Sequence, residues 1–178
     1  WLADAPAVIQ TWFAGQEFGC ALADILLGEV NPSGKLPITF PASLEDTPAF
    51  TNYPGEFGKV HYGEGLYVGY RWYSSRSIQP LFCFGHGLSY TSFEYSAGSI
   101  VEQNVDGSVT IEFDLQNSGE RLGKETVQVY LQALQSVVAK PKLQLACFTK
   151  VSLQPGEKRR LRLVLEAESF AHWDVEKG

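Results

Sequence analysis

The sequence has little positive charge and no long apolar run. Lys and Arg number 14 against 20 Asp and Glu, so the formal net charge is −6 at pH 7. A nucleic-acid-binding protein needs a basic face to displace counterions from phosphates, and binding to an anionic membrane also requires one. No apolar run approaches the ~18 residues of a membrane-spanning helix. The composition therefore indicates no nucleic acid and no membrane as partners.

Cysteine is scarce, and no CxxC pair is present among Cys20, Cys83 and Cys147. An odd number of widely spaced cysteines gives neither a zinc signature nor a disulfide framework. Every asparagine fails as a glycosylation acceptor, as Asn31 does because Pro32 follows it. The first residues also lack the pattern of a signal peptide. These absences favour an intracellular or bacterial protein.

Methionine is absent, and the chain opens with Trp1. Because a translation product normally begins with methionine, we expect the 178 residues to be an internal piece of a longer protein. Hydrophobic residues make up 44% of the chain and charged residues 19%. That proportion is too apolar for a disordered chain and is enough to build a folded core.

Residues 1–45 have the pattern of the end of an α/β domain. Residues 7–13 are apolar and β-prone, which predicts a short strand. Apolar residues then recur at helical spacing from 17 to 27, and Gly28 is the residue type that ends helices. The two prolines within residues 36–41 confine that extended stretch to a sheet edge or a crossing segment. One strand and one helix cannot form an α/β layer alone, so the rest of that domain is expected upstream.

Residues 46–95 are expected to be an interdomain connection, rich in aromatic residues and glycine. Their apolar residues follow neither the helical nor the strand period. Connections this long without regular structure are usually functional or interfacial, so we expect this one to lie across other surfaces with its rings packed. Its aromatic residues include Tyr53, Phe57, Tyr62, Tyr67, Tyr70, Trp72, Tyr73, Phe82, Phe84, Tyr90, Phe93 and Tyr95.

Residues 96–178 change to a period of two, which is typical of strands with one buried face. Turn sequences separate the alternating stretches at 117–119 and 154–156. Several short alternating strands predict an all-β, immunoglobulin-like sandwich, and the fibronectin type III-like version is favoured because no cysteine pair is placed to bridge the sheets. The alternating apolar residues are Val109, Ile111, Phe113 and Leu115, then Val127, Val129 and Leu131, then Leu161, Leu163 and Leu165.

Two carboxylates are candidates for chemistry. Glu17 opens the predicted helix where a strand gives way to it, the end of the strands at which α/β sheets hold ligands. A carboxylate there serves either as an acid or sugar ligand, or as the complement of the helix macrodipole or of a cation at a domain interface. Glu64 is either catalytic or paired with a cation such as Arg71. Glycosidases use two carboxylates ~5–10 Å apart, and sequence alone does not place these two at that distance.

Other reactive patterns are missing. His86 lies between two glycines, where a histidine is either a base or a hydrogen-bonded turn residue. His61 and His172 have no metal-ligand partners at suitable spacing, so no metal site is predicted. A nucleophile elbow, a phosphate loop and a dinucleotide fingerprint are all absent. No metal or organic cofactor is implied.

The motifs taken together resemble the C-terminal region of a glycoside hydrolase family 3 enzyme, most like the β-glucosidases. The resemblance covers nearly the whole chain, in order. Two stretches depart from it: Cys83 stands where the family usually has proline, and residues 143–148 replace a charged run of the family pattern. The motifs are WFAGQE at 12–17, ALADILLG at 21–28, NPSGKLP at 31–37, YGEG at 62–65, VGYRWY at 68–73, PLFCFGHGLSYT at 80–91, NSG at 117–119 and GKETVQVY at 123–130.

The resemblance implies a mixed fold in which the remnant of an α/β sandwich domain is followed by a fibronectin type III-like sandwich. It places the catalytic aspartate nucleophile on an upstream barrel domain and the acid/base glutamate on an upstream loop, so no catalytic residue is expected in this chain. Glu17, Glu64 and Arg71 are then expected at a pocket rim or a domain interface. The family mechanism is retaining, through a glycosyl-enzyme intermediate.

The resulting prediction is the C-terminal part of a β-glucosidase, inactive by itself, whose partners are the missing catalytic domains and, through the parent enzyme, a β-glucoside or oligosaccharide. Two alternatives stay open: a free-standing fibronectin-like adhesion module, and the same family acting on another sugar, such as a β-xylosidase. If residues 1–45 lack their parent sheet, apolar side chains of the first helix stay in water at ~1.5–3 kcal/mol each. We therefore expect the isolated chain to dimerise, aggregate or fray at its N-terminus.

Overall fold

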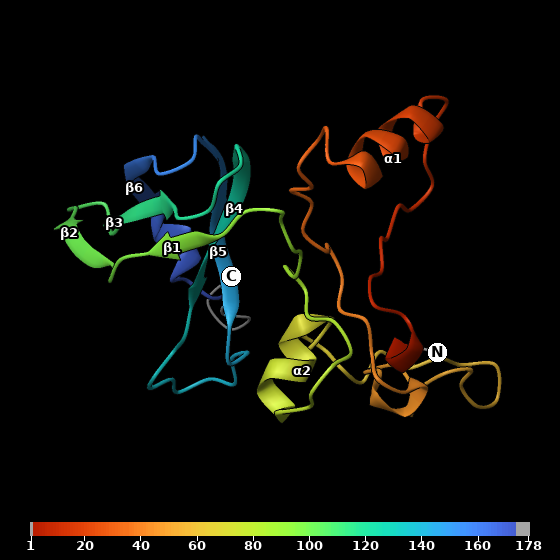
Figure 1. The fold of residues 1–178 in the computed structure, drawn as a ribbon. Helices are drawn as coiled ribbons and strands as arrows, with labels where there is room; N and C mark the ends of the chain where they lie inside the picture. The colour runs from red at the N-terminus through yellow and green to blue at the C-terminus, as the bar shows by residue number, and fades with distance from the viewer. Residues whose placement is uncertain (1, 174–178) are drawn as a thin grey trace.

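The computed structural model describes residues 2–173 as an N-terminal segment followed by a β-sandwich (Figure 1). Trp1 and residues 174–178, which belong to the first and last predicted units, lie outside the described residues. The N-terminal segment holds two helices, α1 (Phe18–Leu27) and α2 (Tyr70–Arg76), and α2 lies between the sandwich and the rest of that segment. Three single-turn 3₁₀ helices span Leu2–Asp4, Leu44–Asp46 and Ala167–Ser169. No helix within residues 2–173 is long and apolar enough to cross a membrane.

The sandwich consists of two antiparallel sheets. In the larger sheet β3 is central, pairing with both β1 and β2 and also with β6. The smaller sheet is the pair of β4 and β5. The strands of the two sheets are β1 (Phe93–Tyr95), β2 (Ser99–Gln103), β3 (Val109–Asn117), β4 (Gly123–Leu131), β5 (Gln144–Leu153) and β6 (Lys158–Leu165).

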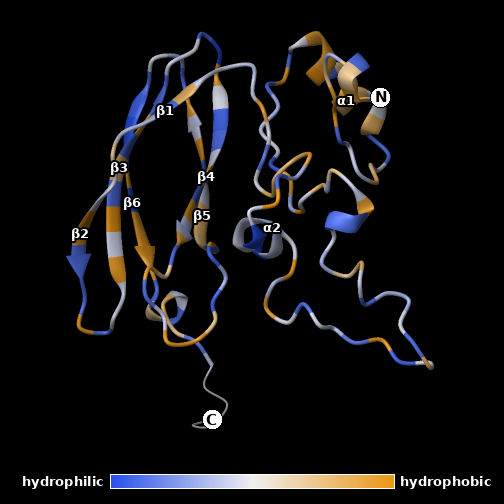
Figure 2. Ribbon diagram, turned by 90° about the horizontal axis from the view of Figure 1, so that it is seen from below, coloured by the Kyte–Doolittle hydropathy of each residue, from blue (hydrophilic) through white to orange (hydrophobic). Residues whose placement is uncertain are grey.

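The core lies between the two sheets and confirms the alternation seen in the sequence. Phe113 and Leu115 of β3 pack against Val127 of β4 and against Val151 and Leu153 of β5. Leu115 and Leu153 are fully buried. Because side chains alternate across a strand, intervening residues such as Lys150 and Ser152 of β5 are exposed, while Thr110 of β3 departs from this rule and is buried. Figure 2 shows how the hydropathy of the residues varies along the strands. The predicted strands at 109–115, 127–131 and 161–165 are therefore confirmed as β3, β4 and β6.

Strand β5 was missed by the search for alternating residues. Its second half alternates, with Val151 and Leu153 buried. Its first half is partly buried on successive residues from Leu145 to Cys147, because α2 also approaches it: the backbone N–H of Leu145 donates to the Tyr70 hydroxyl at 2.8 Å. A strand contacted from both sides loses the period-two signal on which the prediction depends.

The first helix is confirmed, but the strand predicted before it is wrong. Helix α1 ends at Gly28, whose φ of +78° is the left-handed conformation that terminates helices without a Cβ penalty. Residues 7–13 are irregular, and no backbone hydrogen bond joins them to another described segment. A β-strand needs hydrogen bonds to a neighbouring strand, and no strand of residues 2–173 lies beside this stretch. The side chain of Phe13 is fully exposed.

Residues 36–41 form the crossing segment that their prolines predict. Leu36 exchanges backbone hydrogen bonds with Gly85 and His86, and Phe40 pairs with Phe82 in an isolated antiparallel bridge. The crossing segment therefore binds residues 81–86 of the connection.

The connection also contains a helix that its irregular spacing did not predict. Helix α2 buries Tyr73, and the indole N–H of Trp72 donates to the carbonyl oxygen of Asp46 at 3.0 Å. The guanidinium of Arg76 lies 4.6 Å from the Trp72 ring centroid, within the range of a cation–π interaction. Seven residues are too few to show a helical stripe in a segment so rich in aromatic residues.

Candidate functional site: the junction between the N-terminal segment and the sandwich

Asn31 ties the N-terminal segment to the sandwich and to the chain that enters it. Its amide Nδ2 donates to the carbonyl oxygen of Leu122, in the β3–β4 turn, at 3.0 Å. Its Oδ1 accepts from the hydroxyl of Ser89 at 2.9 Å and from the backbone N–H of Tyr90 at 2.8 Å. One side chain therefore connects the loop after α1, the sandwich and the last residues of the connection.

Asn117 does the same from within the sandwich. It is fully buried, and its Nδ2 donates to the carbonyl oxygens of Arg121 at 2.7 Å and Leu153 at 3.0 Å. Its Oδ1 accepts from the Thr91 hydroxyl at 2.7 Å and from the backbone N–H of Gly119 at 3.1 Å. Both donors and both lone pairs of the amide are used, so the buried polar group is satisfied.

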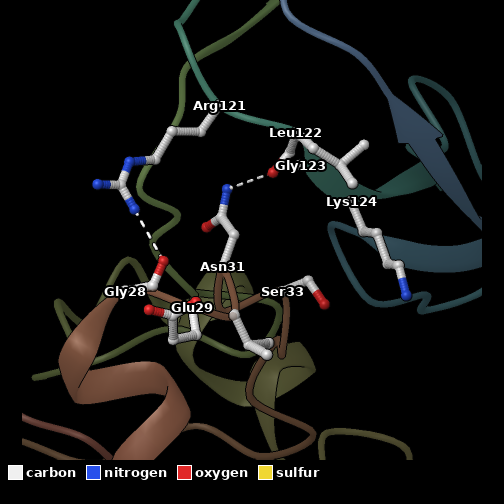
Figure 3. Close-up of a pocket in the computed structure, with 9 residues that line it drawn as sticks. Gly28, Glu29, Asn31, Ser33, Arg121, Leu122, Gly123 and Lys124 are labelled. Carbon is white, nitrogen blue, oxygen red and sulfur yellow. Dashed lines mark hydrogen bonds between the residues drawn. The ribbon is translucent and has the colours of Figure 1, made fainter.

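A reciprocal contact flanks Asn31 (Figure 3). Arg121 reaches from the sandwich and donates from Nη1 to the carbonyl oxygen of Gly28 at 3.0 Å, while Asn31 reaches the opposite way to Leu122. This guanidinium caps one of the carbonyl groups left unpaired at the end of α1, where a cation is also favoured by the helix dipole.

Between these contacts lies a pocket of about 430 Å³. Its charged side chains are one carboxylate, Glu29, and two cations, Arg121 and Lys124. A retaining glycosidase site needs two carboxylates, so this lining fits a junction rather than a hydrolytic site. The pocket is lined by Gly28, Glu29, Val30, Asn31, Ser33, Arg121, Leu122, Gly123 and Lys124.

A partly buried ion pair strengthens the junction. Lys35 Nζ lies 3.2 Å from Glu125 Oε2 and donates to the carbonyl oxygen of Gly87 at 2.8 Å. The other oxygen of Glu125 accepts from the Tyr95 hydroxyl at 3.0 Å. Burial, together with the charge of Glu125, raises the pKa of Tyr95, so this hydroxyl stays protonated and donates at every physiological pH. The side chains of the pair are 18% and 13% exposed, so water screens it less than a surface pair.

Aromatic packing covers the side of the smaller sheet that faces α2. The rings of Tyr70 and Phe84 stack with centroids 4.7 Å apart, and Tyr130 of β4 meets Tyr70 edge-on at 5.9 Å. Beside them the amide of Gln128 donates to the carbonyl oxygen of Gly85 at 3.1 Å. Gly85 has φ +79°, and a Cβ on it would overlap the Gln128 Oε1. The close approach of connection and strand therefore requires glycine.

Glu17, Glu64 and Arg71, the candidates from the sequence, do not line the pocket at Asn31. Glu17 is exposed at the start of α1 and makes no side-chain cap hydrogen bond. Glu64 lies in a turn before α2, and Arg71 lies on α2. No ion pair of residues 2–173 includes any of them, and α1 and α2 lie well apart in both views (Figures 1 and 2). The structure does not join Glu17 to Glu64 by any interaction.

No cofactor site emerges from the described residues. Within residues 2–173 no group of three or more His, Cys, Asp and Glu side chains is placed to hold a metal ion. His86 lies in a turn, with its ring 5.5 Å from that of Phe82 and its carbonyl oxygen accepting from Leu36 N–H.

The sequence did not reveal Asn31, Asn117 and Arg121 as junction residues. Both asparagines stand at the head of a turn motif, NPSG and NSG, and were assigned to turns for that reason. Turn asparagines use the side chain for local hydrogen bonds, and Asn117 does bond the N–H of Gly119 in this way. Asn117 also donates to the carbonyl oxygen of Arg121, four residues away, and the other bonds reach 26 to 91 residues along the chain, which no local pattern encodes.

Family models match both halves of the chain. The glycosyl hydrolase family 3 C-terminal domain matches residues 1–90, and the fibronectin type III-like domain matches residues 125–178. The mixed architecture, with few helices followed by two β-sheets, agrees with an α/β unit followed by a sandwich.

Similar proteins are called β-glucosidases. The chain is 44% identical to the thermostable beta-glucosidase B of Acetivibrio thermocellus, across 100% of this chain and 25% of that protein. It is 43% identical to a beta-glucosidase of Kluyveromyces marxianus, across 100% of this chain and 22% of that one. The chain thus spans about a quarter of the length of the curated relatives it matches.

Solved structures that resemble this chain are also called beta-glucosidases. The family 3 beta-glucosidase of Bifidobacterium adolescentis superimposes with a TM-score of 0.88 at 38% identity, over 93% of this chain and 24% of that one. Beta-glucosidase 3B of Thermotoga neapolitana, solved in complex with glucose, gives 0.85 at 41% identity, over 92% and 23%. The family 3 C-terminal domain thus covers the first half of the chain, and the fibronectin type III-like domain covers residues 125–178. This chain belongs to glycosyl hydrolase family 3.

Proposed function

We propose that this chain is the C-terminal part of a retaining β-glucosidase that removes terminal, non-reducing β-linked glucose. The observation that carries this proposal is the 44% identity with a thermostable beta-glucosidase over the entire chain. The motifs within residues 12–91 that resemble family 3 fall inside the same matched region. Because the chain matches only a quarter of that relative, the activity belongs to the longer protein.

Within that protein we assign this chain a supporting role. A retaining glycosidase needs a carboxylate nucleophile and a carboxylic acid ~5–5.5 Å apart, and we place both upstream. The nucleophile attacks the anomeric carbon to form a glycosyl-enzyme, and the acid, now a base, activates the water that releases the sugar. No residue of this chain takes part in either step in this proposal.

The chain's own contribution is to hold domains in a fixed relation. A misplacement of 1 Å at a distant site can reduce catalysis on the order of 100-fold, so orientation has a direct catalytic value. The hydrogen bonds of Asn31 and Asn117 and the ion pair of Lys35 with Glu125 join the two halves of the chain at several points. These bonds favour one orientation of the sandwich relative to the segment that continues into the catalytic part.

Glu17, Glu64 and Arg71 belong to the interface with the upstream domains in this proposal. All three lie in the N-terminal segment, and none forms an ion pair within residues 2–173. The apolar residues Phe18, Leu26 and Leu27 of α1 are exposed as well. Side chains of this size are rarely grouped in the open on a soluble monomer, so a further protein surface is expected to cover them.

The test is hydrolysis of an aryl β-glucoside by the purified 178-residue chain beside the full-length product of its gene. We expect turnover by the full-length protein alone. Turnover by the short chain would refute the supporting role and make Glu17 and Glu64 the first residues to replace. An aryl β-xyloside run in parallel decides the sugar, since faster xyloside hydrolysis would replace the β-glucosidase with a β-xylosidase of the same family.

A further inference from the structure

A second pocket lies where α2 meets the smaller sheet (Figure 2). Its volume is about 420 Å³, within the range of small-molecule sites. It shares no lining residue with the pocket at Asn31. Its walls come mainly from α2, from residues between 77 and 84 of the connection, from Tyr130 of β4 and from residues 142–143. We call it the Tyr70 pocket.

Aromatic rings form much of the wall of the Tyr70 pocket, and packing holds them in place. Tyr70 stacks on Phe84 with ring centroids 4.7 Å apart, and Tyr130 meets Tyr70 edge-on at 5.9 Å. Tyr73, the fourth ring of the lining, is only 5% exposed. A further ring that packs against such rings gains binding energy beyond the area it buries, and a wall that is already ordered loses little entropy when a ligand binds.

Three hydrogen-bond donors of the lining are not used within residues 2–173. The Tyr70 hydroxyl accepts from the backbone N–H of Leu145 at 2.8 Å, and no hydrogen bond of the described residues uses its own proton. The side chains of Ser77 and Lys142 likewise form no hydrogen bond there, and no ion pair includes Lys142. The backbone N–H of Lys142 donates to the Ser75 hydroxyl at 3.0 Å, which holds this lysine next to α2. A ligand with acceptor groups therefore finds donors that compete with no contact of the described residues.

The charge of the Tyr70 pocket favours an anion. Lys142 is the one charged side chain among the described residues that line it, and no carboxylate is among them. Aromatic rings also attract cations, but the ammonium group of Lys142 would repel a cation here. A carboxylate offers two acceptor oxygens, and its hydrogen bonds with an ammonium group and a hydroxyl are stronger than those between neutral groups.

We propose that the Tyr70 pocket binds an aromatic carboxylic acid. The ring of the ligand packs against the aromatic wall, and its carboxylate accepts hydrogen bonds from Lys142 Nζ and from the Tyr70 hydroxyl. An aliphatic acid keeps the ion pair but lacks the ring contacts, whereas an uncharged aromatic compound lacks the ion pair. The proposal does not depend on the β-glucosidase activity, because it gives these residues no role in hydrolysis.

The thiol of Cys83 reports whether the pocket is occupied. It is exposed and lines the pocket. Burial raises the pKa of Tyr130, and the charges of Tyr70 and Cys83 add to this effect, so the thiol lies near the Tyr130 hydroxyl. A ligand in the pocket is therefore expected to shield Cys83 from alkylation. Cys20, which is exposed on α1 and outside the lining, serves as an internal control.

The test follows the alkylation of the full-length protein by iodoacetamide in the presence of hydrocinnamate. Trypsin releases residues 77–121 as one peptide whose only cysteine is Cys83, so mass spectrometry gives the alkylation rate at this position. We expect saturating hydrocinnamate to slow the alkylation of Cys83 roughly tenfold, because a ligand that fills a pocket also covers its wall. The alkylation rate of Cys20 should not change.

Two further probes separate the ring from the charge. Hydrocinnamamide keeps the ring and removes the charge, and cyclohexanepropionate keeps the charge and removes the aromatic ring. Half-maximal protection of Cys83 should need roughly tenfold more of the amide. It should need roughly threefold to tenfold more of the cyclohexyl acid.

Two variants test the assigned cation. Lys142→Gln should weaken the binding of hydrocinnamate roughly tenfold, and the acid and its amide should then protect Cys83 equally. The control Lys150→Gln alters an exposed lysine of β5 outside the lining and should leave the protection unchanged.

Four results would overturn the proposal. Unchanged alkylation of Cys83, or equal slowing at Cys20, would mean that hydrocinnamate does not occupy the pocket. Equal protection by the three probes would mean a site without preference for aromatic acids. An unchanged affinity in Lys142→Gln would place the carboxylate elsewhere. A Cys83 that resists alkylation without any probe would mean that the longer protein covers the pocket. The aryl β-glucoside assay is a separate readout, so a failure of the proposed function does not alter this comparison.

Discussion

Replacing Asn117 by alanine should strongly destabilise the sandwich. The amide makes four side-chain hydrogen bonds, and its removal leaves the carbonyl oxygens of Arg121 and Leu153, the Thr91 hydroxyl and the Gly119 N–H without that partner. Each buried group left unsatisfied costs about 1–3 kcal/mol. One water molecule in the space of the lost amide can restore two or three of these bonds.

One or two groups then stay unpaired, so the net loss is about 1–6 kcal/mol in the free energy of unfolding, with a midpoint of about 3 kcal/mol. For a chain of this size each kcal/mol lowers Tm by roughly 2–4 °C, which corresponds to a fall of about 10 °C. Urea denaturation followed by circular dichroism gives the free energy, and a thermal scan gives Tm. The matched control is Asn104→Ala, since Asn104 is exposed and its side chain donates to Ser108 alone; it should cost about 1 kcal/mol or less.

Asn117→Asp separates hydrogen bonding from packing, because it keeps the shape of the side chain. A carboxylate cannot donate to the two carbonyl oxygens and brings a buried charge beside them, so at pH 7 it should destabilise at least as much as alanine. Burial raises the pKa of such a carboxyl, so the folded state binds its proton more tightly and the deficit should shrink as the pH falls. A cost below about 1 kcal/mol for both variants would refute the reasoning.

Three further outcomes are expected. Gly85→Ala should lower the free energy of unfolding by about 2–3 kcal/mol, since the new Cβ overlaps Gln128, while Gly58→Ala, also at positive φ but in open space, should cost about 1 kcal/mol in the same urea titration. Hydrogen bonds from Arg160 and Lys158 hold the pKa of Asp114 at about 2, below its ordinary 3.8, so the stabilisation is complete above pH 4 and is lost as the pH falls toward 2; Asp114→Asn should flatten this part of the acid titration. Amides of α1 should exchange with deuterium quickly, or the short chain should dimerise or aggregate in light scattering, and a monodisperse monomer with protected α1 amides would contradict this.

Strands β3, β4 and β6 were predictable because each of them carries its own evidence. One buried face makes apolar residues recur at every second position, as they do over residues 109–115 of β3 and at Leu161, Leu163 and Leu165 of β6. The helix α1 was predictable for a similar reason, with a local stripe and Gly28 to end it. The strand predicted at residues 7–13 failed because it has no partner strand. Residues 7–13 are apolar and β-prone, but a strand is a property of a pair, and the described residues provide no partner.

The candidate site was less predictable than the fold. The sequence pointed to Glu17, Glu64 and Arg71 because charged side chains are typical of reactive sites. The junction instead uses the amides of Asn31 and Asn117, the guanidinium of Arg121 and the ammonium group of Lys35. Their bonds connect residues far apart in sequence, and only the folded chain brings them together. The expectation that the catalytic carboxylates lie outside the chain came from the family resemblance. Periodicity and residue spacing within the chain do not address it.

Five hydrogen bonds at and beside the junction share one asymmetry. Side-chain donors come from Asn31, Lys35, Tyr90, Arg121 and Gln128, and in every case the acceptor is a main-chain carbonyl oxygen, of Leu122, Gly87, Ile25, Gly28 and Gly85 respectively. Any amino acid provides a carbonyl oxygen, so an acceptor position constrains the path of the chain and not the identity of its residue. A substitution at Leu122 or Ile25 therefore keeps the acceptor oxygen, whereas the loss of any of the five donor side chains removes a bond.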